Sequence, residues 1–168
     1  FARKAVIGEV DETQVAREDD QYAARHNPFV YFHSIIDDEA SCGEHVVDLG
    51  ELPAALEAVD TTPNLVYITP DLCSDAHDDP CVDGRPGGPE SADDFLEEWV
   101  PQITDSPAFQ EGGLLVITFD EAELAGETGD SSACCDEPTG PNVDQPGING
   151  PGGGRTGALL LSPRIEPG

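Results

Sequence analysis

Four continuous apolar runs set the strongest limit on how this chain can fold. They cover residues 28–32, 64–69, 113–119 and 157–162. Their apolar residues are consecutive rather than alternating with polar ones, which is typical of strands buried on both faces of a parallel sheet. Because helical patterns lie between the runs, we predict an α/β fold in which helices sandwich a mostly parallel sheet.

The helical patterns lie at 51–59 and 91–104, and a further one covers roughly 12–25. In the pattern at 91–104, Ser91 is the expected N-cap and acidic residues occupy the first turn. Pro101 is expected to kink or end this helix, because proline cannot donate the backbone hydrogen bond of a helix interior.

Two segments do not fit the alternation of strands and helices. Residues 78–90 are rich in Pro, Gly and Asp, and residues 124–155 form a long Gly-rich loop. A loop of about 30 residues in a compact domain is usually either functional or disordered. The string "GPGGGRTG" at 150–157 lacks the spaced glycines and the Lys-Ser/Thr of a phosphate loop, so we interpret it as an approach to the last strand.

The charge of the chain excludes two classes of partner. Asp and Glu number 35 against seven Lys and Arg, which gives a formal net charge of −28. Such a chain repels nucleic acid and anionic membrane surfaces, and it has no apolar run of about 20 residues that would predict a transmembrane helix. Since salt screens self-repulsion, the composition indicates a halophilic or salt-tolerant source.

Five cysteines indicate an oxidising compartment. Cys73 and Cys81 lie in a loop that can close on itself, whereas the odd count leaves at least one thiol unpaired, for which Cys42 is our candidate. The pairing of the adjacent Cys134 and Cys135 stays open. A four-cysteine zinc site is the competing interpretation, but the chain contains no CxxC pair.

Carboxylates follow two of the apolar runs. "VYITPD" ends at Asp71, and "LVITFDE" ends at Asp120 and Glu121. In open α/β sheets ligands bind beyond the carboxyl ends of the strands, and converging carboxylates are tolerable when a divalent cation lies between them. We therefore expect Asp120 and Glu121 to contact a metal or a substrate. Asp71 is equally consistent with a turn cap.

The four histidines differ in their surroundings. His77 lies in "SDAHDD", where neighbouring aspartates would orient it as a ligand, although an isolated loop histidine is more often only solvated. His26 in "ARHNPF" closes a helical pattern, where a protonated imidazole is favourable in any case. His33 and His45 have no clear companions, and we assign them structural roles.

Five motifs in order resemble one family. "YAARHNPFVYF", "TPNLVYITPDLCSDAHDDPC", "ADDFLEEWVPQI", "GGLLVITFDEAE" and "GGGRTGALLLSP" look like the bacterial phosphoesterase family of acid phosphatases and non-specific phospholipases C, within the alkaline-phosphatase-like superfamily. The resemblance covers about residues 21–168. It implies that residues 1–168 are the C-terminal portion of a single phosphoesterase domain in a secreted, metal-dependent hydrolase of phosphate esters.

The resemblance also implies roles for individual residues. Asp120 and Glu121 would bind the divalent metal ion, whose identity (Ca, Mg, Mn or Zn) stays open. His77 would be a catalytic residue that contacts the phosphate or a metal, with Asp75 beside it as a substrate-binding residue. The resemblance implies that His26 lines the phosphoryl pocket with the help of Asn27. Its nucleophile is a Ser or Thr hydroxyl that becomes transiently phosphorylated.

The part of the family that carries this nucleophile and the other metal ligands has no match in residues 1–20. We therefore expect the chain to be inactive alone and to depend on a missing N-terminal portion of the same protein. The alternative is a non-catalytic acidic module that binds cations or takes part in assembly on a hydrolase scaffold.

Overall fold

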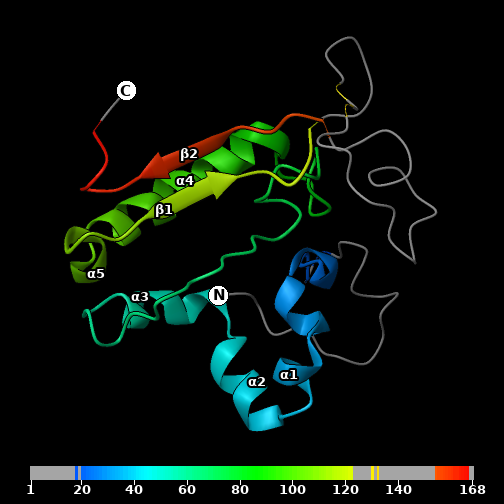
Figure 1. The fold of residues 1–168 in the computed structure, drawn as a ribbon. Helices are drawn as coiled ribbons and strands as arrows, with labels where there is room; N and C mark the ends of the chain where they lie inside the picture. The colour runs from blue at the N-terminus through cyan, green and yellow to red at the C-terminus, as the bar shows by residue number, and fades with distance from the viewer. Residues whose placement is uncertain (1–17, 19, 123–129, 131, 133–153, 167–168) are drawn as a thin grey trace. The chain divides into compact units, whose positions relative to one another are not determined.

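The computed structural model describes residues 18, 20–122, 130, 132 and 154–166. The chain forms two compact units, unit 1 over Phe1–Glu111 and unit 2 over Gly112–Gly168 (Figure 1). Half of the helix predicted at 12–25 and most of the Gly-rich loop at 124–155, including Cys134 and Cys135, fall outside the described residues. In the described half of the predicted helix, residues 20–23 are not helical and only the 3₁₀ helix η2 begins, at Ala24.

Short helices form the first half of unit 1. They are η2 (Ala24–His26), η3 (Pro28–Tyr31), α1 (His33–Ile36) and α2 (Glu39–His45). The strand predicted at 28–32 is wrong, because this run forms the 3₁₀ helix η3. The physical reason is local: the side chain of Asn27 accepts a hydrogen bond from Phe29 N at 3.0 Å, and Pro28 pre-sets the first helical position.

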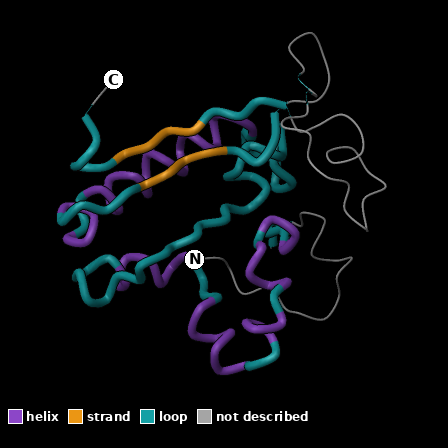
Figure 2. The backbone as a smooth tube through the Cα atoms, in the orientation of Figure 1, coloured by secondary structure: helices purple, strands orange, loops and turns teal. Residues whose placement is uncertain are grey.

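The second half of unit 1 contains η4 (Leu49–Glu51), α3 (Leu52–Ala55), α4 (Gly88–Thr104) and α5 (Pro107–Gln110). Figure 2 shows the long helix α4 in purple, and it begins three residues before the predicted N-cap, Ser91. Pro89 occupies the first turn, where a missing N–H is harmless. Pro101 lies inside the helix and does not end it, because the helix continues to Thr104, the last residue of the predicted pattern.

The predicted helix at 51–59 is shorter in the structure. It reduces to η4 and α3, and α3 ends at Ala55. The hydroxyls of Thr61 and Thr62 then donate hydrogen bonds to the Ala55 carbonyl at 3.1 and 2.9 Å. These side chains satisfy a terminal carbonyl that the helix leaves without a partner.

Unit 2 contains β1 (Leu115–Thr118) and β2 (Ala158–Leu161), inside the runs predicted as strands at 113–119 and 157–162. The two strands pair antiparallel, with Leu115 opposite Leu161 and Thr118 opposite Ala158. They form the one sheet among the described residues. The run at 64–69 is not a strand. The mostly parallel sheet of an α/β sandwich thus stays a prediction.

The core of unit 1 includes the disulfide. Leu52, Asn27, Cys73 and Cys81 are the largest fully buried side chains of the described chain. The two sulfur-bearing side chains are at most 1% exposed, and Tyr22 and Ala24 form a further buried cluster against which Val30 packs. The loop that carries the candidate site is therefore attached to the best-buried part of the unit.

Candidate functional site

The loop at 71–88 is closed by the predicted disulfide between Cys73 and Cys81, which the structure confirms. The hydroxyl of Ser91 on α4 lies 3.3 Å from the sulfur of Cys73. Backbone hydrogen bonds fasten the loop at both ends, from Asp78 N to Leu72 O at 2.8 Å and from Gly88 N to Asp78 O at 2.9 Å. The disulfide and these backbone hydrogen bonds give the loop a defined shape.

Asp71 caps the first turn of this loop. Its side chain accepts a hydrogen bond from Ser74 N at 2.9 Å, and its carbonyl accepts from Ser74 N and Asp75 N at 3.0 and 2.9 Å. Of the two interpretations of Asp71, the structure supports the turn cap.

A second segment is tied to the loop from far away in the sequence. The carbonyl of Gln21 accepts a hydrogen bond from Leu72 N at 2.9 Å, and the side-chain amide of Gln21 donates to Asp83 at 2.9 Å. Arg85 in turn donates to Asp83 at 2.8 Å. These contacts explain how η2, which ends at His26, comes to lie beside a loop that is 49 residues further along the chain.

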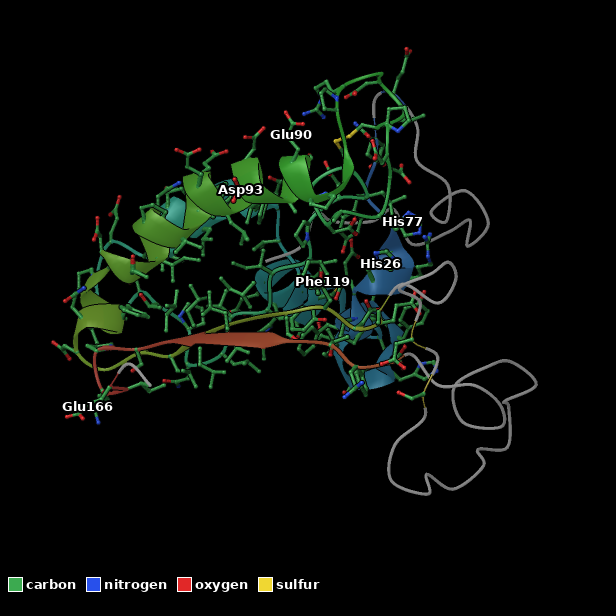
Figure 3. The ribbon with its side chains drawn as sticks, turned by 90° about the horizontal axis from the view of Figure 1, so that it is seen from above. His26, His77, Glu90, Asp93, Phe119 and Glu166 are labelled. Atoms are coloured by element: carbon green, nitrogen blue, oxygen red, sulfur yellow. A yellow bond between two sulfur atoms is a disulfide. The ribbon has the colours of Figure 1, made fainter. Side chains whose placement is uncertain are left out.

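Asp75 connects the two histidines that the sequence singled out. Its Oδ2 lies 3.1 Å from Nδ1 of His26, and its Oδ1 accepts a hydrogen bond from the backbone N of His77 at 2.9 Å. The imidazole of His77 has its own carboxylate, since its Nδ1 lies 2.9 Å from Oδ1 of Asp78. The two rings are side by side in Figure 3, with centroids 6.0 Å apart and an interplanar angle of 55°.

Burial differs across this cluster. The side chains of His26 and Asp75 are 25% and 17% exposed, whereas that of His77 is 52% exposed. Burial raises the pKa of Asp75, and the hydrogen bond from the His77 backbone together with the neighbouring His26 opposes this rise. The Asp75 carboxylate therefore depends on the two histidine residues to offset the loss of water around it.

Asn27 is the fully buried neighbour of His26. Its Oδ1 is used as the cap of η3, and its Nδ2 has no hydrogen-bond partner in the described part of the chain. The buried hydroxyl of Tyr22 likewise has no hydrogen-bond partner in that part of the chain. Burial raises the pKa of Tyr22, and the nearby Asn27 side chain opposes this only in part. A role for Asn27 in substrate binding stays a prediction.

Asp120 and Glu121 follow β1 in unit 2, where both side chains are exposed. Within the described residues, no group of three or more His, Cys, Asp or Glu side chains is arranged to hold a metal ion. Two adjacent carboxylates supply the hard oxygen donors that Ca²⁺ and Mg²⁺ prefer, but fewer than the six or more ligands these ions take. By themselves these two residues do not make a complete metal site.

The remaining histidines have local partners. Nδ1 of His33 lies 3.0 Å from Asp37, one turn away in sequence, and Nδ1 of His45 donates to the Ser41 carbonyl at 2.8 Å. The hydrogen bond and the charge of Asp37 raise the pKa of His33. Both side chains are exposed, and the structural roles expected for them stay a prediction.

No family model matches the chain, and no curated protein or solved structure is significantly similar to it. Among the residues that the structure describes, no helix is long and apolar enough to cross a membrane. The phosphoesterase interpretation therefore rests on the five sequence motifs and on the chemistry of the described side chains.

Proposed function

We propose that this chain carries part of a secreted, metal-dependent enzyme that hydrolyses phosphate esters, of the acid phosphatase or phospholipase C type. The observation that supports this best is the pair of imidazoles 6.0 Å apart, each with its Nδ1 at an aspartate. Histidine is the side chain best suited to exchange protons near neutral pH.

The roles of the two histidines follow from which ring atom each leaves available. Because Nδ1 of His26 and of His77 faces a carboxylate, Nε2 is the atom left for a substrate. A neutral ring accepts a proton at Nε2, and a protonated ring donates a hydrogen bond there to a phosphoryl oxygen. The more exposed His77 is the contact to the phosphoryl group, and the less exposed His26 exchanges the proton.

The acidic composition constrains how the substrate is attracted. A chain with a net charge of −28 repels a phosphate ester, so a cation must neutralise part of that charge. The family resemblance implies that Asp120 and Glu121 contribute carboxylate ligands to this divalent ion. The Ser or Thr nucleophile comes from the N-terminal portion implied by the family resemblance.

The second candidate function is an acidic module that binds cations without catalysis. The exposed, adjacent carboxylates of Asp120 and Glu121 favour it. This module would bind a divalent ion but would not respond to changes at His26 or His77. The two candidates therefore make opposite predictions for the histidine variants.

The test uses protein expressed from the whole gene that encodes this chain, with p-nitrophenyl phosphate as substrate. We expect His26→Ala and His77→Ala each to lower kcat by about 10²-fold or more, because each removes a proton-transfer or phosphoryl contact. His33→Ala is the matched control and should retain activity, and exhaustive dialysis against a chelator should abolish turnover. Full activity in both histidine variants would overturn the proposed function.

A further inference from the structure

Both carboxylate oxygens of Asp75 are engaged by other parts of the protein. Oδ2 faces Nδ1 of His26, and Oδ1 accepts the hydrogen bond from the backbone of His77. The side chain is 17% exposed, so little of it is left to touch a substrate. The family resemblance places Asp75 beside the substrate, whereas these contacts give its carboxylate a different task.

We infer that Asp75 is a positioning residue that holds His26 in the tautomer with its proton on Nδ1 and its lone pair on Nε2. An ionised carboxylate only accepts hydrogen bonds, so a neutral imidazole beside it must place its proton on the facing nitrogen. The catalytic role of this tautomer rests on the proposed function. The tautomer itself can be measured whether or not the chain is part of an enzyme.

Long-range contact distinguishes this pair from the other two His–Asp pairs of unit 1. His26 and Asp75 are 49 residues apart in sequence, whereas His33–Asp37 and His77–Asp78 are four and one residues apart. The side chains of His33 and Asp37 are 86% and 67% exposed. Water competes with that pair and weakens it, so the sheltered Asp75 contact is expected to fix a tautomer where the exposed His33–Asp37 contact does not.

Asp75 also sets the relation between the two rings. One carboxylate contacts both the side chain of His26 and the backbone of His77. Asp75 therefore holds the two histidine residues next to each other. Between Asp75 and His77, Ala76 adopts a φ of 71°, in the left-handed region that non-glycine residues rarely occupy. The bond from His77 N to Oδ1 closes this turn and offsets its strain.

The test is the tautomer of each histidine in the ¹⁵N-labelled 168-residue protein at neutral pH, from long-range correlations between ring protons and ring nitrogens. We expect the Nδ1–H form for His26 in the unmodified chain. In Asp75→Asn, the single amide oxygen stays with His77 N and the NH₂ group faces His26. His26 should therefore invert to the Nε2–H form while the backbone amide spectrum stays folded.

Asp37→Asn is the matched control, because it makes the same change at the exposed His33 pair and should leave the signals of His26 unchanged. Asp75→Ala is the second variant, in which His26 should also leave the Nδ1–H form. An Nε2–H tautomer in the unmodified protein, or an unaltered Nδ1–H tautomer in both Asp75 variants, would overturn the inference.

Kinetics in protein from the whole gene separate this inference from the proposed function. We expect Asp75→Asn to lower kcat for p-nitrophenyl phosphate by about 10²-fold with little change in KM, since a misoriented base affects the reaction more than ground-state binding. If the tautomers are as expected but the unmodified protein hydrolyses no substrate, the positioning role is supported and only the proposed function is overturned. Normal kcat in Asp75→Asn would overturn the positioning role even if hydrolysis is confirmed.

Discussion

The two units of the chain differ in what they bury: among the described residues, every buried side chain lies in unit 1. In unit 1, the half-buried His26 and Asp75 are held by contacts that span 49 residues, and the buried disulfide lies behind them. In unit 2, Val116 and Leu160 are 49% and 48% exposed on paired strands. The strands of unit 2 therefore gain little from apolar burial among the described residues, whereas unit 1 buries the disulfide behind its histidine loop.

A leucine-to-alanine substitution in each unit tests this difference in burial, and it has the largest expected effect on the free energy of unfolding. Leu52 is fully buried in unit 1, so Leu52→Ala should lower the free energy of unfolding by about 3 kcal/mol. Leu160→Ala in β2 should lower it by less than about 1 kcal/mol, because half of that side chain already contacts water. Urea denaturation measures both, and equal losses would contradict the difference in burial.

Removal of the disulfide is the next largest change. The bond between Cys73 and Cys81 closes a loop with a sequence separation of 8. By the loop-entropy estimate, Cys73→Ala/Cys81→Ala should lower the free energy of unfolding by about 2–3 kcal/mol. Urea curves with and without reductant provide the control, because reductant should destabilise the unmodified chain and leave the double variant unchanged. A double variant as stable as the oxidised protein would contradict this prediction.

The pH dependence of stability should have opposite signs at two aspartates. The pKa of Asp75 is raised, mainly by burial, so its stabilising contribution is complete below the ordinary carboxyl pKa and is lost as pH rises through the raised value. Hydrogen bonds from Ser132 and Arg155 lower the pKa of Asp130 to about 2. Its contribution is therefore present above the ordinary carboxyl pKa and is lost as pH falls toward about 2.

Two variants separate these contributions. Asp75→Asn should remove the part of the stability that falls with rising pH, and Asp130→Asn should remove part of the loss in acid. Urea denaturation at a series of pH values between about 2 and 6 measures both slopes. The same slope change in both variants would contradict the assignment of opposite shifts.

The smallest predicted effect concerns backbone strain in the site loop. Ala76 has a φ of 71°, and Ala76→Gly should stabilise the chain by about 0.5–1 kcal/mol because glycine adopts this conformation without a clash. Ala54→Gly in α3 is the control with the opposite sign, a loss of about 0.5–1 kcal/mol, since glycine lowers helix stability. A destabilising Ala76→Gly would show that the loop is not strained there.

The sequence predicted an element correctly where the residues that determine it lie within that element. The runs at 113–119 and 157–162 and the helical pattern at 91–104 contain their own signals, and two cysteines in a short loop predict their disulfide. The run at 28–32 failed because the side chain of Asn27, one residue outside it, caps a 3₁₀ helix.

The partner of His26 could not be predicted from the residues around it. "ARHNPF" contains no acidic side chain, and Asp75 lies at His26 because contacts such as the hydrogen bond from Leu72 N to Gln21 O join two distant segments. A sequence pattern predicts neighbours along one element, whereas this contact depends on two segments folding against each other. By contrast, Asp78 could be predicted as a partner of His77, since the two are adjacent.

The central claim is that His26 and His77 form the phosphoryl-binding part of unit 1, and inorganic phosphate tests it directly. The ring-proton signals of all four histidines are followed during titration at high salt, where the net charge of the chain is screened, with sodium chloride of equal ionic strength as control. We predict saturable shifts at His26 and His77 and none at His33 or His45. No response at His26 and His77, or equal small drifts at all four, would contradict the claim.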